Sequence, residues 1–90
     1  MFVAVALDAG SEERFEEVGG VLEQYGFKKV QAGLWESPSI MEKYLSRLKR
    51  DIDRKTDFYD KLRIYQYPLE GTLIITSLKR KRWKRTKLKI

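Results

Sequence analysis

The 90-residue chain contains no cysteine and no histidine, and each absence excludes a class of chemistry. Without cysteine there is no disulfide framework, no thiolate nucleophile and no cysteine-based zinc site. Without histidine there is no imidazole base and no histidine-bound transition metal. An enzyme built from this chain would have to use carboxylates, hydroxyls, amines or guanidinium groups, with a hard cation that prefers oxygen ligands.

Long hydrophobic runs are also missing. No stretch approaches the ~20 apolar residues of a membrane span. Residues 1–7 (MFVAVAL) lack the basic start and the small-residue cleavage site of a signal peptide. We therefore expect a cytoplasmic protein with no membrane partner. The length fits one domain, and a hydrophobic share of 42% is enough for a modest core without disulfides.

Positive charge is concentrated at the end of the chain. The net charge is +6, from 19 basic and 13 acidic residues, and residues 79–90 hold eight of the basic residues and none of the acidic ones. We expect a folded domain over 1–78 and a basic tail over 79–90 that is mobile or drapes over a partner. Basic residues interleaved with Trp83 favour a nucleic-acid contact. A solubilising or protein-docking tail is the alternative.

Hydrophobic periodicity predicts the element order β-α-β-α-β-β. The apolar run 2–7 is typical of a central strand that is covered on both faces. Ser11 marks the start of a helix, and Gly26 marks its end. The predicted elements after the first strand are helices at 12–25 and 39–54 and strands at 28–36, 61–67 and 72–78. Two helices on one face of a small antiparallel sheet make an α+β sandwich, and we expect a sheet-to-sheet homodimer to cover the other face.

Several details of this pattern concern turns and burial. Gly33 is expected to bend or bulge the strand 28–36. The second helix is expected to open at Ser37-Pro38, or at Ser39 with Glu42 as its capping-box partner. Burial in a dimer core, rather than base stacking, is the expected role of three aromatic residues: Trp35, Tyr65 and Tyr67.

Asp8 and Arg14 are candidate site residues near the end of the first strand. Asp8 either forms a turn with Gly10 or binds a metal ion. Arg14, in the first turn of the following helix, either clamps a phosphate or forms a surface ion pair with Glu13 or Glu17. Both residue types suit chemistry on a phosphate, and both also have ordinary structural uses.

Five features match one known family in their order and spacing. They are a first strand ending in Asp8, a basic residue at Arg14 in the following helix, Tyr25-Gly26-Phe27-Lys28-Lys29-Val30-Gln31, Leu34-Trp35-Glu36, and Asp60-Lys61-Leu62-Arg63-Ile64-Tyr65. Together they resemble the CRISPR-associated Cas-two family over most of residues 1–70. Two positions depart from the family pattern. Gly33-Leu34-Trp35-Glu36 lacks the family's serine, and Lys29 stands where the family has arginine.

The resemblance implies a ferredoxin-like fold and a symmetric homodimer. It also implies a role in spacer acquisition for antiviral defence, in which the dimer holds DNA and bridges two dimers of the Cas-one integrase. Some members of the family are magnesium-dependent endonucleases on RNA or double-stranded DNA, which implies that Asp8 is the metal ligand and catalytic residue. Because one carboxylate holds Mg²⁺ poorly, one ion would be shared across the dimer axis. The resemblance leaves open whether this chain cleaves nucleic acid.

A second family is also similar. Leu22-Glu23-Gln24-Tyr25-Gly26-Phe27, followed by Gln31, resembles virulence-associated protein D, which implies a stand-alone, toxin-like endoribonuclease. A plain RNA-binding module is a third alternative. The basic residues expected to contact nucleic acid are Arg14, Lys28, Lys29, Arg47, Arg50, Arg82, Lys84 and Arg85.

Overall fold

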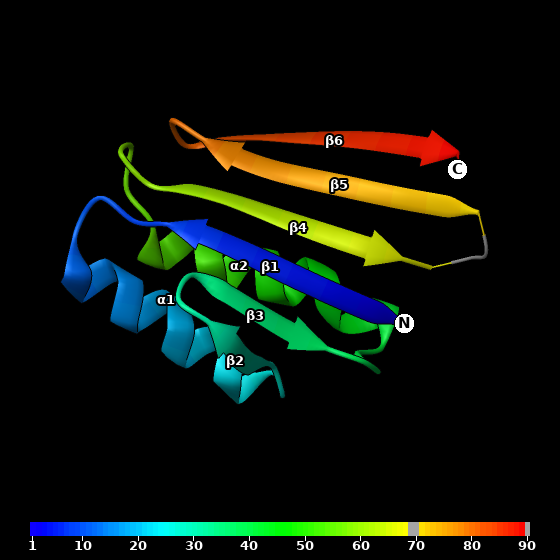
Figure 1. Ribbon diagram of the computed structural model, residues 1–90. Coiled ribbons are helices and arrows are strands. Elements are labelled where there is room, and N and C mark those ends of the chain that lie inside the picture. Colours follow the sequence, from blue (N-terminus) through cyan, green and yellow to red (C-terminus); the bar gives the residue numbers. More distant parts are fainter. Residues whose placement is uncertain (69–70, 90) are drawn as a thin grey trace.

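The computed structural model describes residues 1–68 and 71–89, and its strands form one sheet (Figure 1). The elements are β1 (Phe2–Asp8), α1 (Glu12–Gln24), β2 (Lys28–Gln31), β3 (Leu34–Ser37), the 3-10 turn η1 (Glu42–Tyr44), α2 (Leu45–Lys55), β4 (Lys61–Tyr67), β5 (Thr72–Lys79) and β6 (Arg82–Lys89). The strands are antiparallel in the order β2-β3-β1-β4-β5-β6, and both helices lie on one face. This is a small α+β domain, compatible with the predicted ferredoxin-like fold.

Alternation along the strands separates a covered face, which packs on the helices, from an open face. On β1, Val3, Val5 and Leu7 are buried on the covered face, and the residues between them are partly exposed on the open face. On β4, Leu62 and Ile64 are buried in the same way. The helices complete this core with Val18, Leu22, Leu48 and Ile52.

Helix α1 begins and ends where the sequence predicts. Ser11 Oγ accepts a hydrogen bond from the backbone N–H of Arg14 at 3.2 Å, and Gly26 takes a left-handed φ of 87° after the helix. Gly19 lets this helix approach the sheet closely, because a Cβ there would lie 2.9 Å from Cζ2 of Trp35. The helix therefore packs directly on the face of β3.

The predicted strand 28–36 is a hairpin of two strands, β2 and β3. The chain reverses at Gly33, where φ is 77° and a Cβ would lie 2.9 Å from the carbonyl oxygen of Leu7. Because of this reversal, Trp35 faces the helices and is only 2% exposed, whereas Val30 on the edge strand is half exposed. The expected place of Trp35 in a dimer core is therefore wrong: this side chain fills the protein's own core.

The second helix starts later than predicted. Residues 42–44 form the turn η1, and α2 begins at Leu45, so neither Ser37-Pro38 nor Ser39 opens the helix. The reason is upstream. Ile40 is buried in the core, and its carbonyl oxygen accepts a hydrogen bond from the chain's amino terminus at 3.3 Å. This anchor holds the preceding segment in a non-helical course.

Residues 82–89 form strand β6 rather than a free tail. The strand pairs with β5 along its whole length, so the predicted boundary between domain and tail falls inside a hairpin. Arg80 and Lys81 make the two-residue turn at φ values of 53° and 61°. Lys81 Nζ donates to the carbonyl oxygen of Asp53 at 2.6 Å, and Trp83 Nε1 donates to the Asp53 carboxylate at 3.0 Å. These contacts fasten the hairpin to α2.

Strands β4 and β5 agree with the predicted strands 61–67 and 72–78 to within one residue. The turn predicted at Leu69-Glu70-Gly71 includes residues 69 and 70, which lie outside the described residues. Across residues 1–68 and 71–89, no helix is long and apolar enough to cross a membrane.

Candidate nucleic-acid interface

The open face carries a row of charged residues at the end where β1 finishes. Asp8 of β1 lies opposite Lys61 of β4. Lys61 in turn lies opposite Lys79 of β5, which lies opposite Arg82 of β6. All four are exposed, and at a strand spacing of about 4.8 Å the row is roughly 14 Å long. This end row, as we call these four residues, holds one carboxylate and three cations.

The open face changes from charged to apolar with distance from the end row. The next row still contains the cations Arg63 and Lys84, with Ser77 between them, and the row after it contains Tyr65, Ile75 and Thr86. At the far end, the rings of Phe2 and Tyr67 lie 5.8 Å apart, and Tyr67 and Leu88 are each almost half exposed. One face of the sheet therefore combines cations that suit phosphate with uncovered apolar surface.

The surroundings of Asp8 do not fit a magnesium ion within one copy of the chain. Asp8 lines a shallow concavity of about 270 Å³ that Lys61 and Arg63 also line. In the described residues, no three acidic, histidine or cysteine side chains gather where they could hold a metal ion. Mg²⁺ needs several oxygen ligands, and nearby cations oppose its binding. The predicted metal site therefore depends on Asp8 of a second copy.

Arg14 forms an ion pair that the sequence does not suggest. Its Nε donates to Asp60 at 2.8 Å, and its guanidinium lies 3.7 Å from Asp57, so its partner is neither Glu13 nor Glu17. Asp60 is fully buried and also accepts hydrogen bonds from the backbone N–H groups of Gly10 and Asp57, at 2.6 and 2.7 Å. Burial alone would raise the pKa of Asp60, but these hydrogen bonds and the charge of Arg14 hold it below its usual value. Asp60 thus ties the loop after β1 to the loop after α2, and Arg14 of α1 balances its charge.

Lys28 and Lys29 lie on β2, at the edge of the sheet far from β6. Lys28 is opposite Glu36, so its charge has an acidic neighbour across the strands. Lys29 Nζ lies 5.0 Å from the centroid of the Phe15 ring, which suits a cation–π contact. Neither residue joins the end row.

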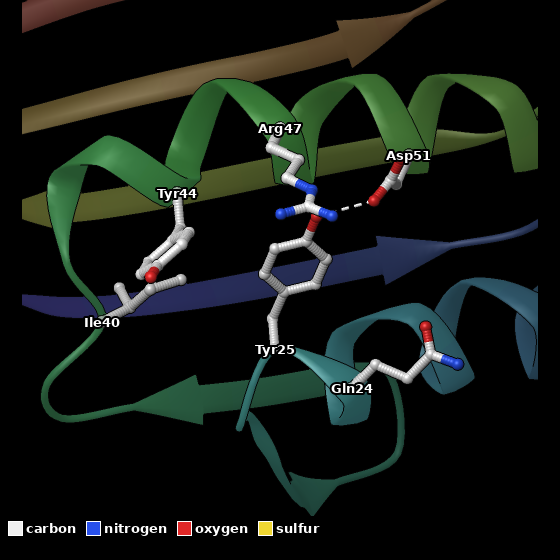
Figure 2. Close-up of a pocket in the computed structure, with 6 residues that line it drawn as sticks. All are labelled: Gln24, Tyr25, Ile40, Tyr44, Arg47 and Asp51. Atoms are coloured by element: carbon white, nitrogen blue, oxygen red, sulfur yellow. Dashed lines mark hydrogen bonds between the residues drawn. The ribbon is translucent and has the colours of Figure 1, made fainter.

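Arg47 lines a pocket of about 430 Å³ between α1 and α2 (Figure 2). In this pocket the hydroxyl of Tyr25 donates a 2.6 Å hydrogen bond to Asp51, and Figure 2 shows Arg47 and Asp51 on the same helix, α2. Burial, and then the bond to Asp51, raise the pKa of Tyr25. This pocket is built from both helices, so Arg47 lies on the helix side of the molecule and away from the open face.

A second cationic surface lies in a groove between α2 and β6. Lys49, Arg50 and Arg85 line this groove, which has a volume of about 390 Å³, together with the indole of Trp83. Burial, and then the charge of Arg85, lower the pKa of Lys49. The hydroxyl of Thr76 also lies in the groove, buried and without a hydrogen-bond partner among residues 1–68 and 71–89. Asp53 also lines the groove, so its cations lie beside one carboxylate.

The structure separates the predicted nucleic-acid residues into groups. Arg82 and Lys84 share the open face with Asp8, Arg50 and Arg85 share the groove, and Arg14 is engaged by Asp60. Lys28, Lys29 and Arg47 lie apart from both cationic surfaces.

Sequence reasoning missed the loop between α2 and β4. The connection from Asp57 to Asp60 reads as polar, yet Phe58 and Tyr59 are 50% and 74% exposed, beside Lys61. Two adjacent aromatic residues outside any periodic segment are the signal that could have found this site. Asp60 itself has no such signal, because its partners Gly10 and Arg14 are far away in the sequence.

Comparisons with known proteins give one structural relative. The structure matches the crystal structure of a hypothetical protein, TT1823, from Thermus thermophilus, with a TM-score of 0.65 and 32% sequence identity. The match covers 79% of this chain and 83% of that chain. No family model and no curated protein matches this chain.

Proposed function

The chain belongs to the same family as the hypothetical Thermus thermophilus protein, and we propose that it acts as the Cas-two-like subunit of a CRISPR spacer-acquisition complex. In this role two copies pair through their sheets, hold DNA by its phosphates, and bridge dimers of the Cas-one integrase. The work is architectural: the dimer keeps the DNA and the integrase in register. Such a protein needs a self-complementary face and sequence-independent positive charge.

The open face of the sheet is the observation that most supports this proposal. Its far end carries the exposed side chains of Tyr67 and Leu88 beside the partly exposed Phe2, and this apolar surface gains from burial against a second copy. Its other end carries Lys61, Lys79 and Arg82, which suit a phosphate backbone. A dimer that buries the apolar end leaves the cations free for DNA.

The surroundings of Asp8 favour this architectural role over cleavage. A nuclease of this family would need Mg²⁺, and the only carboxylate in the end row is Asp8, which lies opposite Lys61. Two copies of Asp8 close to the dimer axis would be required to hold one ion. We therefore place the endonuclease activity second. The alternative to both is a stand-alone, toxin-like endoribonuclease that resembles virulence-associated protein D.

The decisive experiment is reconstituted integration of a short DNA duplex by the Cas-one integrase, with and without this chain. We expect integration to require the chain, and light scattering to show a dimer at low micromolar concentration. Tyr67→Glu, which places a charge in the apolar end, should give monomers and abolish integration. Tyr44→Glu is the matched control, because Tyr44 is similarly exposed but lies on the helix side. A stable wild-type monomer, or integration without the chain, contradicts the proposal.

Cleavage is tested separately with the chain alone. If the second role holds, RNA or DNA is cut only with Mg²⁺ or Mn²⁺, and Asp8→Ala or EDTA abolishes the cutting. The architectural role predicts instead that Asp8→Ala supports integration at the wild-type rate. Metal-dependent RNA cleavage by a chain that does not support integration would favour the endoribonuclease.

A further inference from the structure

Phe58 and Tyr59 form an exposed aromatic pair in the loop between α2 and β4. Their ring centroids are 5.5 Å apart with an interplanar angle of 81°. Half of the Phe58 side chain and three quarters of Tyr59 are exposed, although both could have been replaced by polar residues at no cost to the core. Adjacent exposed aromatic residues are typical of a binding surface.

The backbone that carries this pair is held on both sides. Asp60, which follows Tyr59, is fully buried and bonds to Gly10 and Arg14, and its carboxylate also accepts a hydrogen bond from the Asp57 N–H before the pair. The Asp60 N–H donates in turn to the carbonyl oxygen of Asp57 at 3.0 Å. A buried carboxylate therefore fixes the loop at both ends, so a ligand would not have to order it.

Cations surround the aromatic pair. Phe58 and Tyr59 line a concavity of about 370 Å³ together with Lys61, Lys79 and Arg80, and none of the described residues that line it is acidic. Arg80 is held there by the β-turn, in a left-handed conformation that asparagine or glycine adopts more readily. Lys61 and Lys79 belong to the end row. The concavity thus continues the cationic end of the open face around the end of the sheet.

We propose that this concavity, which we call the aromatic platform, binds an unpaired nucleotide of single-stranded nucleic acid. A base stacks on Phe58 or Tyr59, and the neighbouring phosphates lie against Lys61, Lys79 and Arg80. A duplex cannot use the platform, because its bases already stack on one another. Stacking and phosphate contacts do not involve the 2′-hydroxyl, so DNA and RNA strands bind alike. The inference rests on the proposed function in one respect, that the chain binds nucleic acid. What it adds is that the strand bound here is single.

The test is fluorescence anisotropy with the full chain, a short oligothymidine and a blunt duplex. Phe58→Ala/Tyr59→Ala should bind the oligothymidine about 5- to 150-fold more weakly, as loss of one stacked base predicts, and should bind the duplex unchanged. Its slope of log affinity against log salt should also be unchanged. Lys79→Ala/Arg80→Ala should instead make the slope of log affinity against log salt for the single strand shallower by about 1.4, because two phosphate contacts are lost.

Two control variants separate stacking from general surface effects. Val30→Ala/Met41→Ala removes exposed apolar side chains of similar exposure elsewhere and should leave the affinity for the oligothymidine unchanged. Tyr59→Phe keeps the ring and should bind within about twofold of the wild type. If Tyr59→Phe binds as weakly as the alanine variant, stacking is not the interaction and the inference is wrong.

The remaining outcomes distinguish this inference from the proposed function. A wild-type chain that binds duplex but not oligothymidine overturns the platform and leaves the DNA-bridging role intact. A chain that binds neither overturns both. If Phe58→Ala/Tyr59→Ala keeps its affinity for the single strand but loses the Cas-one integrase, the aromatic pair docks a protein and the inference is again wrong.

Discussion

The two faces of the sheet are built from alternate residues of the same strands, yet they differ in almost every physical property. On β4, Ile64 of the covered face is fully buried, whereas Tyr65, next to it in the sequence, is partly exposed on the open face. The covered face is mostly apolar, with Ser37, Gln66 and Thr76 as its buried polar residues. The open face changes from cationic to apolar across about four residues per strand. The covered face therefore accounts for the fold, and the open face is where function can vary without disturbing it.

The covered face itself ends at β6. The strand β5 still buries Ile74 and Leu78, but on β6 (Arg82–Lys89) Trp83 alone is partly buried against the core, where its indole bonds to Asp53. The other β6 side chains are exposed. Strand β6 is thus held by backbone pairing with β5 and by a few contacts to α2, which leaves its many charges available to a partner.

The largest expected effect contrasts the two faces directly. Ile64→Ala, on the covered face, should lower the free energy of unfolding by about 2–5 kcal/mol, because it leaves a cavity in the core. Ile75→Ala, on the neighbouring strand but the open face, should cost about 1 kcal/mol or less. Urea unfolding at several protein concentrations measures both and separates folding from association. Equal losses would mean that the open face is as important to the fold as the covered one.

The next effect concerns the buried carboxylate that joins the loops at one end of the sheet. Asp60→Asn should cost about 2 kcal/mol at neutral pH, because charge-assisted hydrogen bonds become neutral ones. The folded-state pKa of Asp60 is depressed, so its contribution is present above the unfolded pKa of about 3.9 and is lost as pH falls through the folded value. Unfolding curves from neutral to acid pH should therefore converge for the variant and the wild type. If the difference in unfolding free energy between Asp60→Asn and the wild type does not change with pH, the charge of Asp60 is not the cause of the lost stability.

The smallest effect tests how the edge hairpin is attached. Lys81→Ala should lower stability by about 0.3–1 kcal/mol, because Lys81 Nζ bonds to the carbonyl oxygens of Asp53 and Thr56 at the end of α2. Lys79→Ala removes a neighbouring exposed lysine on the open face and should change stability by less than about 0.5 kcal/mol. Both are measured by thermal unfolding at low salt, with high salt reducing the difference. If the two variants are indistinguishable, the hairpin is held by strand pairing alone.

Much of the fold could be predicted because its signals are local. The apolar run of β1, the cap at Ser11 and the glycine at Gly26 each act within a few residues, and all are found where predicted. The errors share one origin. Gly33 has the sequence signature of either a bulge or a turn, and only the approach of Leu7 from a distant strand favours the turn. The start of α2 likewise depends on Ile40 entering a core that other elements build.

By itself the sequence determined an α+β domain with two helices, a central apolar strand and an excess of positive charge near residues 79–90. Only the tertiary structure decided that this charged segment is strand β6, because its sequence RWKRTKLK has no apolar alternation and its pairing comes from the backbone of β5. Tertiary structure also joined Arg14 to Asp60, 46 residues apart, and so held Phe58 and Tyr59 beside Lys79 and Arg80. Local patterns encode which elements form. Contacts between residues far apart in the chain decide which side chains meet, because packing, and not periodicity, selects them.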